Sequence, residues 1–130
     1  MYELVYTSLA TGPHGTAATA AILAAARLRN AACGVTGLLL FDGRRYVGLL
    51  EGGEREVGGL SVLIAADPRH AAFEVRHESS DGQRRFDGCA LAYAELARGP
   101  GGLEALAQQQ GLQIVAGLLA LLPQLQVQRG

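Results

Sequence analysis

The 130-residue sequence contains no lysine, and all eleven of its basic residues are arginine. Schiff-base chemistry and the phosphate-binding lysine of P-loop proteins both need an amine, so both are excluded. Eleven arginines against twelve acidic residues leave a formal net charge of −1. Because there is no excess of positive charge to neutralise phosphates, we do not expect nucleic-acid binding.

Cysteine and long hydrophobic runs are also scarce. Cys33 and Cys89 lie far apart in the sequence, and the first residues lack the charged region followed by an apolar region that is typical of a signal peptide. This pattern predicts a reduced, cytoplasmic protein without a disulfide framework. The longest apolar stretches, residues 17–26 and 115–122, are too short to cross a bilayer. We therefore expect no membrane span.

The overall composition of the chain is sufficient for one folded domain. The sequence is 49% hydrophobic and 18% charged, which is typical of a globular chain and not of a disordered one. We expect a core over residues 1–98 and a C-terminal helical cap over residues 99–130, after the glycine-rich stretch at 99–102.

Local patterns predict the order of the elements. An Ala-rich segment with Thr16 as its cap indicates a helix, and Asp42-Gly43 between two apolar runs indicates a hairpin. A loop is expected at residues 11–15. Strands are expected at residues 3–8, 35–41, 45–51, 73–78 and 89–94, and helices at 17–30 and 54–66.

This order is βαββαβ with one more strand, which predicts an α+β, ferredoxin-like fold with an extra strand. Its sheet is expected to be antiparallel, with both helices on one face. Two further helical patterns, residues 103–110 and 112–122, have the apolar content to cover the other face or to form a partner surface.

Residues capable of catalysis are few. His14 lies in the expected loop, His77 on the polar side of an alternating strand, and His70 beside an acid and an arginine after a helix. Solvated or capping imidazoles explain them better than a metal site does. Ser8 and Cys33 have no local histidine and acid motif, so a hydrolase is disfavoured. Acyl phosphate hydrolysis on an arginine-rich ferredoxin-like scaffold is the remaining enzyme alternative.

Several short motifs follow one another along the chain: Leu4-Val5-Tyr6-Thr7-Ser8, Ile22-Leu23, Ala26-Arg27-Leu28-Arg29-Asn30, Gly34-Val35-Thr36-Gly37-Leu38-Leu39, Leu50-Glu51-Gly52 and Asp67-Pro68-Arg69-His70. Together these motifs resemble the BLUF family of blue-light sensors that use flavin. The resemblance covers about residues 1–93, and Phe86 resembles a further landmark of that family.

The resemblance implies FAD held between the two helices on one face of the sheet. It implies that Tyr6 donates an electron and a proton to the excited ring, and that Asn30 binds the polar edge of that ring. Arg29, Arg69 and His70 are implied at the ribityl and phosphate end, and Ile22 and Asp67 belong to the same matching motifs. Without the resemblance, a packing tyrosine, a capping asparagine and a helix stop at 67–70 are the favoured interpretations.

The sequence departs from the family at four positions. Gly48 stands where the family has the glutamine that links the tyrosine to the flavin, and glycine has no side chain with which to form hydrogen bonds. Cys89 and Leu91 stand where many members have Trp and Met, and Leu63 replaces an arginine believed to contact the ring. The usual photocycle is therefore expected to be absent, and Gly48 is expected to leave a void, room for water or space for a shifted ligand.

These observations favour a non-enzymatic, FAD-binding blue-light sensor domain with a degenerate photocycle. It is expected to signal through protein contacts to an unidentified partner, as a homodimer or higher homo-oligomer. The alternative is a BLUF-fold interaction module that has lost its flavin and has no cofactor.

Overall fold

The computed structural model describes residues 1–11, 16–99 and 102–130, with side chains from residue 19 onward in the second range. The expected loop at 11–15, including His14, lies outside the described residues except for Thr11. So does the capping side chain of Thr16. In the part of the chain that is described, no helix is both long enough and apolar enough to cross a membrane.

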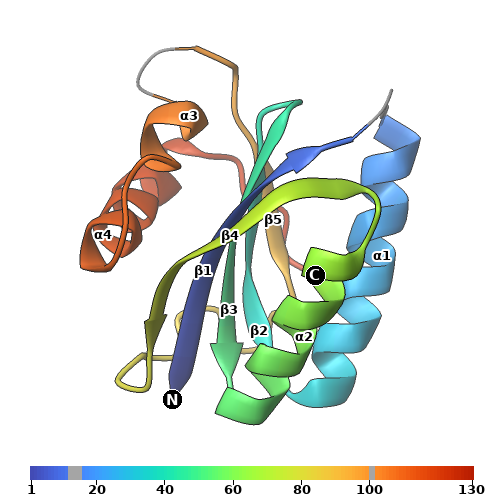
Figure 1. Cartoon of the computed structure of the whole chain (residues 1–130), viewed down its shortest axis with the longest axis vertical. Coiled ribbons are helices and arrows are strands. Elements are labelled where there is room, and N and C mark those ends of the chain that lie inside the picture. Colours follow the sequence, from blue (N-terminus) through green and yellow to red (C-terminus); the bar gives the residue numbers. More distant parts are fainter. Residues whose placement is uncertain (12–15, 100–101) are drawn as a thin grey trace.

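A five-stranded sheet forms the centre of the molecule, in the order β4-β1-β3-β2-β5 (Figure 1). Neighbouring strands are antiparallel except β2 and β5, which are parallel. The strands are β1 (Tyr2–Ala10), β2 (Thr36–Phe41), β3 (Arg45–Gly52), β4 (His70–Ser79) and β5 (Ala92–Glu95).

The expectation of an entirely antiparallel sheet is therefore wrong at one edge. β4 and β5 lie at opposite edges of the sheet, and residues 80–91 connect them. Because this connection returns to the end of the sheet at which β2 begins, β5 runs in the same direction as β2. The strand predicted at 89–94 begins later, at Ala92.

Helices cover both faces of the sheet (Figure 1). α1 (Thr16–Cys33) and α2 (Glu54–Ala66) lie on one face. α3 (Leu103–Leu106), α4 (Leu112–Leu121) and a 3-10 turn (Leu122–Gln124) lie on the other. The α+β, ferredoxin-like fold with an extra strand and two C-terminal cap helices is confirmed. The helix predicted at 103–110 is shorter than expected and ends at Leu106.

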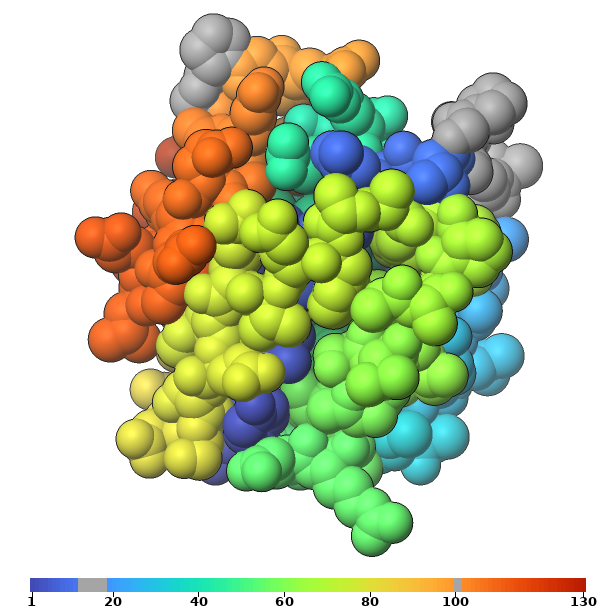
Figure 2. Space-filling model, viewed as in Figure 1, coloured from blue at the N-terminus to red at the C-terminus, as the bar shows by residue number. Residues whose placement is uncertain are grey.

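Successive side chains of β1 point to opposite faces of the sheet and belong to two separate hydrophobic cores. Leu4 and Tyr6 face α1 and α2, whereas Val5 faces α3 and α4. The second core also contains Ile114 and Leu118 of α4, so the cap helices bury apolar side chains on the sheet of their own chain. Figure 2 shows the face on which α2 and β4 cover much of β1, which is visible between them and at the upper edge.

The end of α1 is fixed by Gly34. Its φ of +67° is in the left-handed region that favours glycine, and its N–H donates to the Ala31 carbonyl (3.3 Å). The next N–H, of Val35, donates to the Asn30 carbonyl (2.9 Å). This termination places Arg29 and Asn30 in the last turns of α1, beside the sheet.

Candidate functional site

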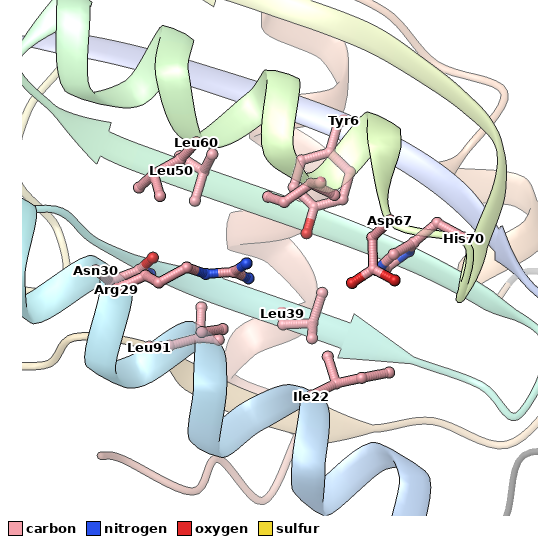
Figure 3. Close-up of a pocket in the computed structure, with 12 residues that line it drawn as sticks. Tyr6, Ile22, Arg29, Asn30, Leu39, Leu50, Leu60, Asp67, His70 and Leu91 are labelled. Carbon is pink, nitrogen blue, oxygen red and sulfur yellow. The ribbon is translucent and has the colours of Figure 1, made fainter.

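A cleft lies between α1 and α2, above the sheet (Figure 3). Its free volume is about 30 Å³, well below the roughly 300–1,000 Å³ of small-molecule sites, because side chains fill most of the cleft. Its wall is mostly apolar, with a few polar groups at the ends. The lining residues are Tyr6, Ile22, Ala26, Arg29, Asn30, Leu39, Leu50, Leu60, Ile64, Asp67, His70 and Leu91.

Tyr6 projects into this cleft from β1. Its ring stacks on Phe73 of β4 with centroids 5.1 Å apart, and its hydroxyl points into the open space (Figure 3). Among the described residues, none forms a hydrogen bond with that hydroxyl. Burial raises the pKa of Tyr6 above its ordinary value of 10.0, with smaller effects of Tyr46 and Arg29. The phenol therefore keeps its proton at neutral pH.

Gly48 lies directly opposite Tyr6 in the pairing of β3 with β1. A Cβ atom at position 48 would contact Cε1 and Cζ of the Tyr6 ring, and would lie 2.6 Å from its hydroxyl oxygen. The tyrosine ring therefore occupies the space that a side chain at position 48 would take. The expected void beside the ring site is not present, because Tyr6 fills it.

Arg29 and Asn30 form one end of the cleft. The guanidinium of Arg29 extends toward the centre of the cleft (Figure 3), and its buried Nε has no hydrogen-bond partner in the described parts of the chain. Asn30 is 4% exposed, and its Nδ2 donates to the Ala90 carbonyl (2.9 Å). Arg29 thus offers an unused donor to the cleft, while Asn30 already binds the segment before β5.

Asp67 and His70 form the opposite end. The Asp67 carboxylate accepts three hydrogen bonds from the Arg69 guanidinium, at 2.7 to 3.1 Å. Nδ1 of His70 lies 2.9 Å from Oγ of Ser8, and the imidazole packs against Tyr46 with ring centroids 4.9 Å apart. Arg69 is not among the residues that line the cleft, and its guanidinium pairs with Asp67.

The Asp67–Arg69 pair predicts how stability depends on pH. Hydrogen bonds from Arg69 lower the pKa of Asp67 from 3.8 to about 2, against the opposing effect of partial burial. A lowered pKa stabilises the fold above pH 3.8, and this stabilisation is lost as the pH falls toward 2. Because Arg69 is about one-third exposed, we expect Asp67→Asn to remove about 1–2 kcal/mol at pH 7.

Urea unfolding of both proteins between pH 7 and pH 2 measures this difference. It should shrink as the pH falls, since protonated aspartic acid resembles asparagine. A difference that stays constant over this range would show that Asp67 acts through its shape and not through its charge.

Leu63 is not part of the cleft. Its side chain is 52% exposed, and it borders a separate surface groove with Cys33 and Arg55. Leu60 and Ile64, which are four residues apart and share one helix face, line the cleft instead. The i, i+4 spacing of these two apolar residues in the sequence was a signal for this inward face.

His77 also differs from the expectation of a solvated imidazole. It is 8% exposed, and its Nε2 lies 2.7 Å from the Glu3 carboxylate, which Arg85 also contacts (2.9 Å). Burial opposes ionisation of Glu3, but the bonds from Arg85 and His77 outweigh it and lower its pKa. A bulge between Val75 and His77 places His77 on the side of Glu3, opposite to the side on which Phe73 stacks with Tyr6.

A family model described as "BLUF: Sensors of blue-light using FAD" matches residues 1–92. The chain belongs to the BLUF family. It is a blue-light sensor domain of the family whose cofactor is FAD. Among curated proteins, none matches the chain significantly.

Solved structures of BLUF proteins have the same fold. BlrB, a BLUF protein in its dark state, is 29% identical with a TM-score of 0.69, and the match covers 92% of this chain and 83% of BlrB. Klebsiella pneumoniae BlrP1, solved with FMN and cyclic diGMP, is 29% identical with a TM-score of 0.65; the match covers 74% of this chain and 25% of BlrP1.

A bacterial light-regulated adenylyl cyclase shares the fold at 24% identity, with a TM-score of 0.70. The match covers 95% of this chain and 34% of the cyclase. The BLUF chain therefore spans about a quarter of BlrP1 and a third of the cyclase. BLUF domains themselves are sensors and not enzymes.

The cleft of this BLUF domain fits a flavin ring in chemical terms. Its apolar walls suit the two faces of an aromatic ring system, and the buried Nε of Arg29 lacks an acceptor. An unsatisfied buried donor costs about 1–3 kcal/mol, which a carbonyl oxygen of the ring would remove. Tyr6 presents a protonated hydroxyl to the same space.

Proposed function

We propose that this BLUF domain holds FAD in the cleft between α1 and α2 and responds to blue light without the hydrogen-bond rearrangement of a switch glutamine. One observation supports this most directly: Tyr6 and Arg29 both direct polar groups into the cleft, and position 48 has no side chain. The bound flavin would supply the absorption of blue light and the acceptance of an electron.

Each side chain has a distinct role in this proposal. Tyr6 is the electron donor, and Phe73 holds its ring in place by stacking. Arg29 donates to an oxygen of the ring, and the amide of Asn30 contributes to the polar edge. The apolar walls, including Ile22, Leu39, Leu50, Leu60 and Leu91, contact the faces of the ring.

The other end of the cleft would hold the ribityl chain. Asp67 and His70 can form hydrogen bonds with its hydroxyl groups, while Arg69 acts through Asp67 as a positioning residue. Gly48 and Leu63 make no ligand contact in this arrangement. Gly48 has no side-chain donor or acceptor, so no side chain at that position can receive the proton of Tyr6.

Titration of the flavin-free chain with FAD, followed by flavin fluorescence, tests the proposed contacts. We expect Arg29→Gln and Asn30→Ala each to weaken FAD binding about tenfold, since each removes a buried hydrogen bond. Leu63→Ala is the matched control on the outer face of α2 and should leave the affinity unchanged. Equal affinities for all four proteins would contradict the assignment of Arg29 and Asn30.

A second function, a cofactor-free interaction module, is favoured by the bond between Asn30 and the Ala90 carbonyl (2.9 Å). This bond uses part of the amide that would otherwise bind the ring. The same titration decides between the two functions, because a relic cleft would take up no FAD at any concentration. Acyl phosphate hydrolysis has less support, since Arg69 is already paired with Asp67.

The output of the domain is proposed to be protein contacts with a partner, in the cytoplasm and within a homo-oligomer. Residues 1–98 would form the sensing core, and residues 99–130 its cap. α3 and α4 pack on the sheet of the same chain but leave Leu112 (75%) and Leu119 (39%) exposed. These two side chains are the apolar groups that the cap presents to another molecule.

A further inference from the structure

The segment from Gln126 to Gly130 lies along the free edge of β5. The N–H of Tyr93 donates to the Gln128 carbonyl (2.8 Å), and the N–H of Gln128 donates to the Tyr93 carbonyl (2.7 Å). The N–H of Leu91 donates to the Gly130 carbonyl (3.2 Å). In Figure 1 the chain passes from α4 behind the sheet to the side of α1. Residues 126–130 thus lie beside β5 and pair with it through one antiparallel bridge, at Gln128; we call them the terminal strand.

This strand is held almost entirely by polar contacts. Gln126, Gln128, Arg129 and Gly130 are exposed, and only Val127 is half-buried against the core. A segment with few buried apolar contacts opens at a low free energy compared with the rest of a fold. Residues 126–130 can therefore leave β5 without unfolding the sheet.

The same contacts connect the strand to the wall of the cleft. Nε of Arg27 donates to the Leu91 carbonyl (3.1 Å), and its Nη2 lies 3.5 Å from the Gln128 carbonyl. Leu91 lines the cleft, and its neighbour Ala90 accepts the bond from Asn30. Sγ of Cys89 contacts both the N–H and the carbonyl of Gly130 at 3.4 Å.

Residues 89–91 consequently have contacts on two sides. On one side, Asn30 of α1 donates to the Ala90 carbonyl and Arg27 of α1 donates to the Leu91 carbonyl. On the other side, Cys89 and Leu91 hold Gly130, the last residue of the terminal strand. A shift of residues 90–91 at the cleft wall would change both sets of bonds together.

We propose that residues 126–130 are a detachable strand whose hold on β5 is set by the cleft wall, with Arg27 as the residue that links them. The dependence on flavin rests on the proposed function, because it assumes that FAD draws the Asn30 amide away from the Ala90 carbonyl. Detachment leaves the main-chain groups at the edge of β5 unpaired.

Amide hydrogen exchange of the flavin-free chain, resolved by NMR, tests the link through Arg27. Arg27→Gln is expected to raise exchange at Leu91, Tyr93 and Gln128 about tenfold, while amides between β1 and β3 keep their protection. Arg55→Gln, at an exposed arginine of α2, is the matched control and should change none of them.

Gln128→Pro provides a second variant that acts on the strand alone. It removes the N–H that donates to the Tyr93 carbonyl, and it should raise exchange at Leu91 and Tyr93 with the sheet intact. Unchanged exchange at both amides in Gln128→Pro, or at all three in Arg27→Gln, would overturn the proposal.

The flavin arm uses FAD with the unmodified chain and with Asn30→Ala. Both the addition of FAD and the loss of the Asn30 amide should raise exchange at Leu91, Tyr93 and Gln128 several-fold, because both release the Ala90 carbonyl. Bound FAD with unchanged exchange would overturn the coupling and leave the proposed function standing. Absence of FAD binding would refute that function, while the Arg27 and Gln128 variants would still decide whether the strand is detachable.

Discussion

Replacing Glu51 with alanine is expected to lower the free energy of unfolding by about 3–5 kcal/mol. Glu51 is fully buried at the end of β3. Its carboxylate accepts hydrogen bonds from Oγ1 of Thr36 (2.8 Å) and from the backbone N–H groups of Arg85 (3.0 Å) and Phe86 (2.7 Å). Alanine would leave these three donors without their acceptor, in a site from which water is excluded.

The effect should extend to the cleft, because the two backbone bonds of Glu51 anchor the segment that leads to Leu91. Guanidinium chloride unfolding measures the loss. Glu51→Gln retains the size of the side chain and one carbonyl acceptor, so its loss should be smaller. Glu54→Gln, at an exposed acid in the first turn of α2, is the surface control and should change stability by less than about 0.5 kcal/mol.

If Glu51→Ala lost less than about 1 kcal/mol, the buried carboxylate would not be the anchor described here. The difference between Glu51→Ala and Glu51→Gln is therefore the informative quantity. It separates the loss of hydrogen-bond acceptors from the loss of side-chain volume.

Gly48→Ala is expected to destabilise the domain by about 1–3 kcal/mol, because its Cβ would overlap the ring of Tyr6. A smaller residue at position 6 should remove this cost. Gly48→Ala introduced together with Tyr6→Val should therefore be less harmful than the sum of the two single substitutions. Chemical denaturation of all four proteins gives the coupling free energy, which we expect to be about 1–2 kcal/mol.

Additive effects in this cycle would contradict the packing of Tyr6 over Gly48. The packing of Tyr6 over Gly48 also affects a variant in which the family's glutamine is restored at position 48. In Gly48→Gln the tyrosine ring must leave its place over β3 before the new amide can face it. We therefore expect that single substitution to cost stability as Gly48→Ala does, and not simply to rebuild the switch.

Much of the fold followed from local sequence signals. α2 spans the predicted residues 54–66, between Gly53 and the Asp67-Pro68 stop. The hairpin predicted at Asp42-Gly43 forms, and the Asp42 carboxylate accepts bonds from the N–H groups of Arg44 and Arg45. Such signals depend on neighbours along the chain, which the sequence displays directly.

The sequence-based predictions were wrong where segments far apart in the chain contact one another. Residues 89–91 were predicted as part of a strand, but they bind Phe86, Arg27 and the C-terminal segment in place of β2. The burial of His77 and Glu51 likewise depends on partners 74 and about 35 residues away. A local pattern contains no information about which distant group will satisfy a polar side chain.

In the candidate site, too, some features were predictable from the sequence and others depended on contacts between distant segments. The resemblance pointed to Tyr6, Arg29, Asn30 and His70, and the structure brings all four to one cleft. Filling of the space at Gly48 was not predictable from composition, since it depends on the register that pairs Tyr6 with Gly48 across two strands. The outward direction of Leu63 follows from the phase of α2, which its spacing from Leu60 could have indicated.

The central claim is that the cleft binds FAD but lacks the switch at position 48. Absorption spectra of the FAD-loaded domain, recorded in the dark and under blue light, test it most directly. The account predicts the visible bands of a bound flavin, at the same wavelengths before and after illumination. A reversible red shift of those bands in the unmodified protein, or a protein that binds no flavin, would contradict it.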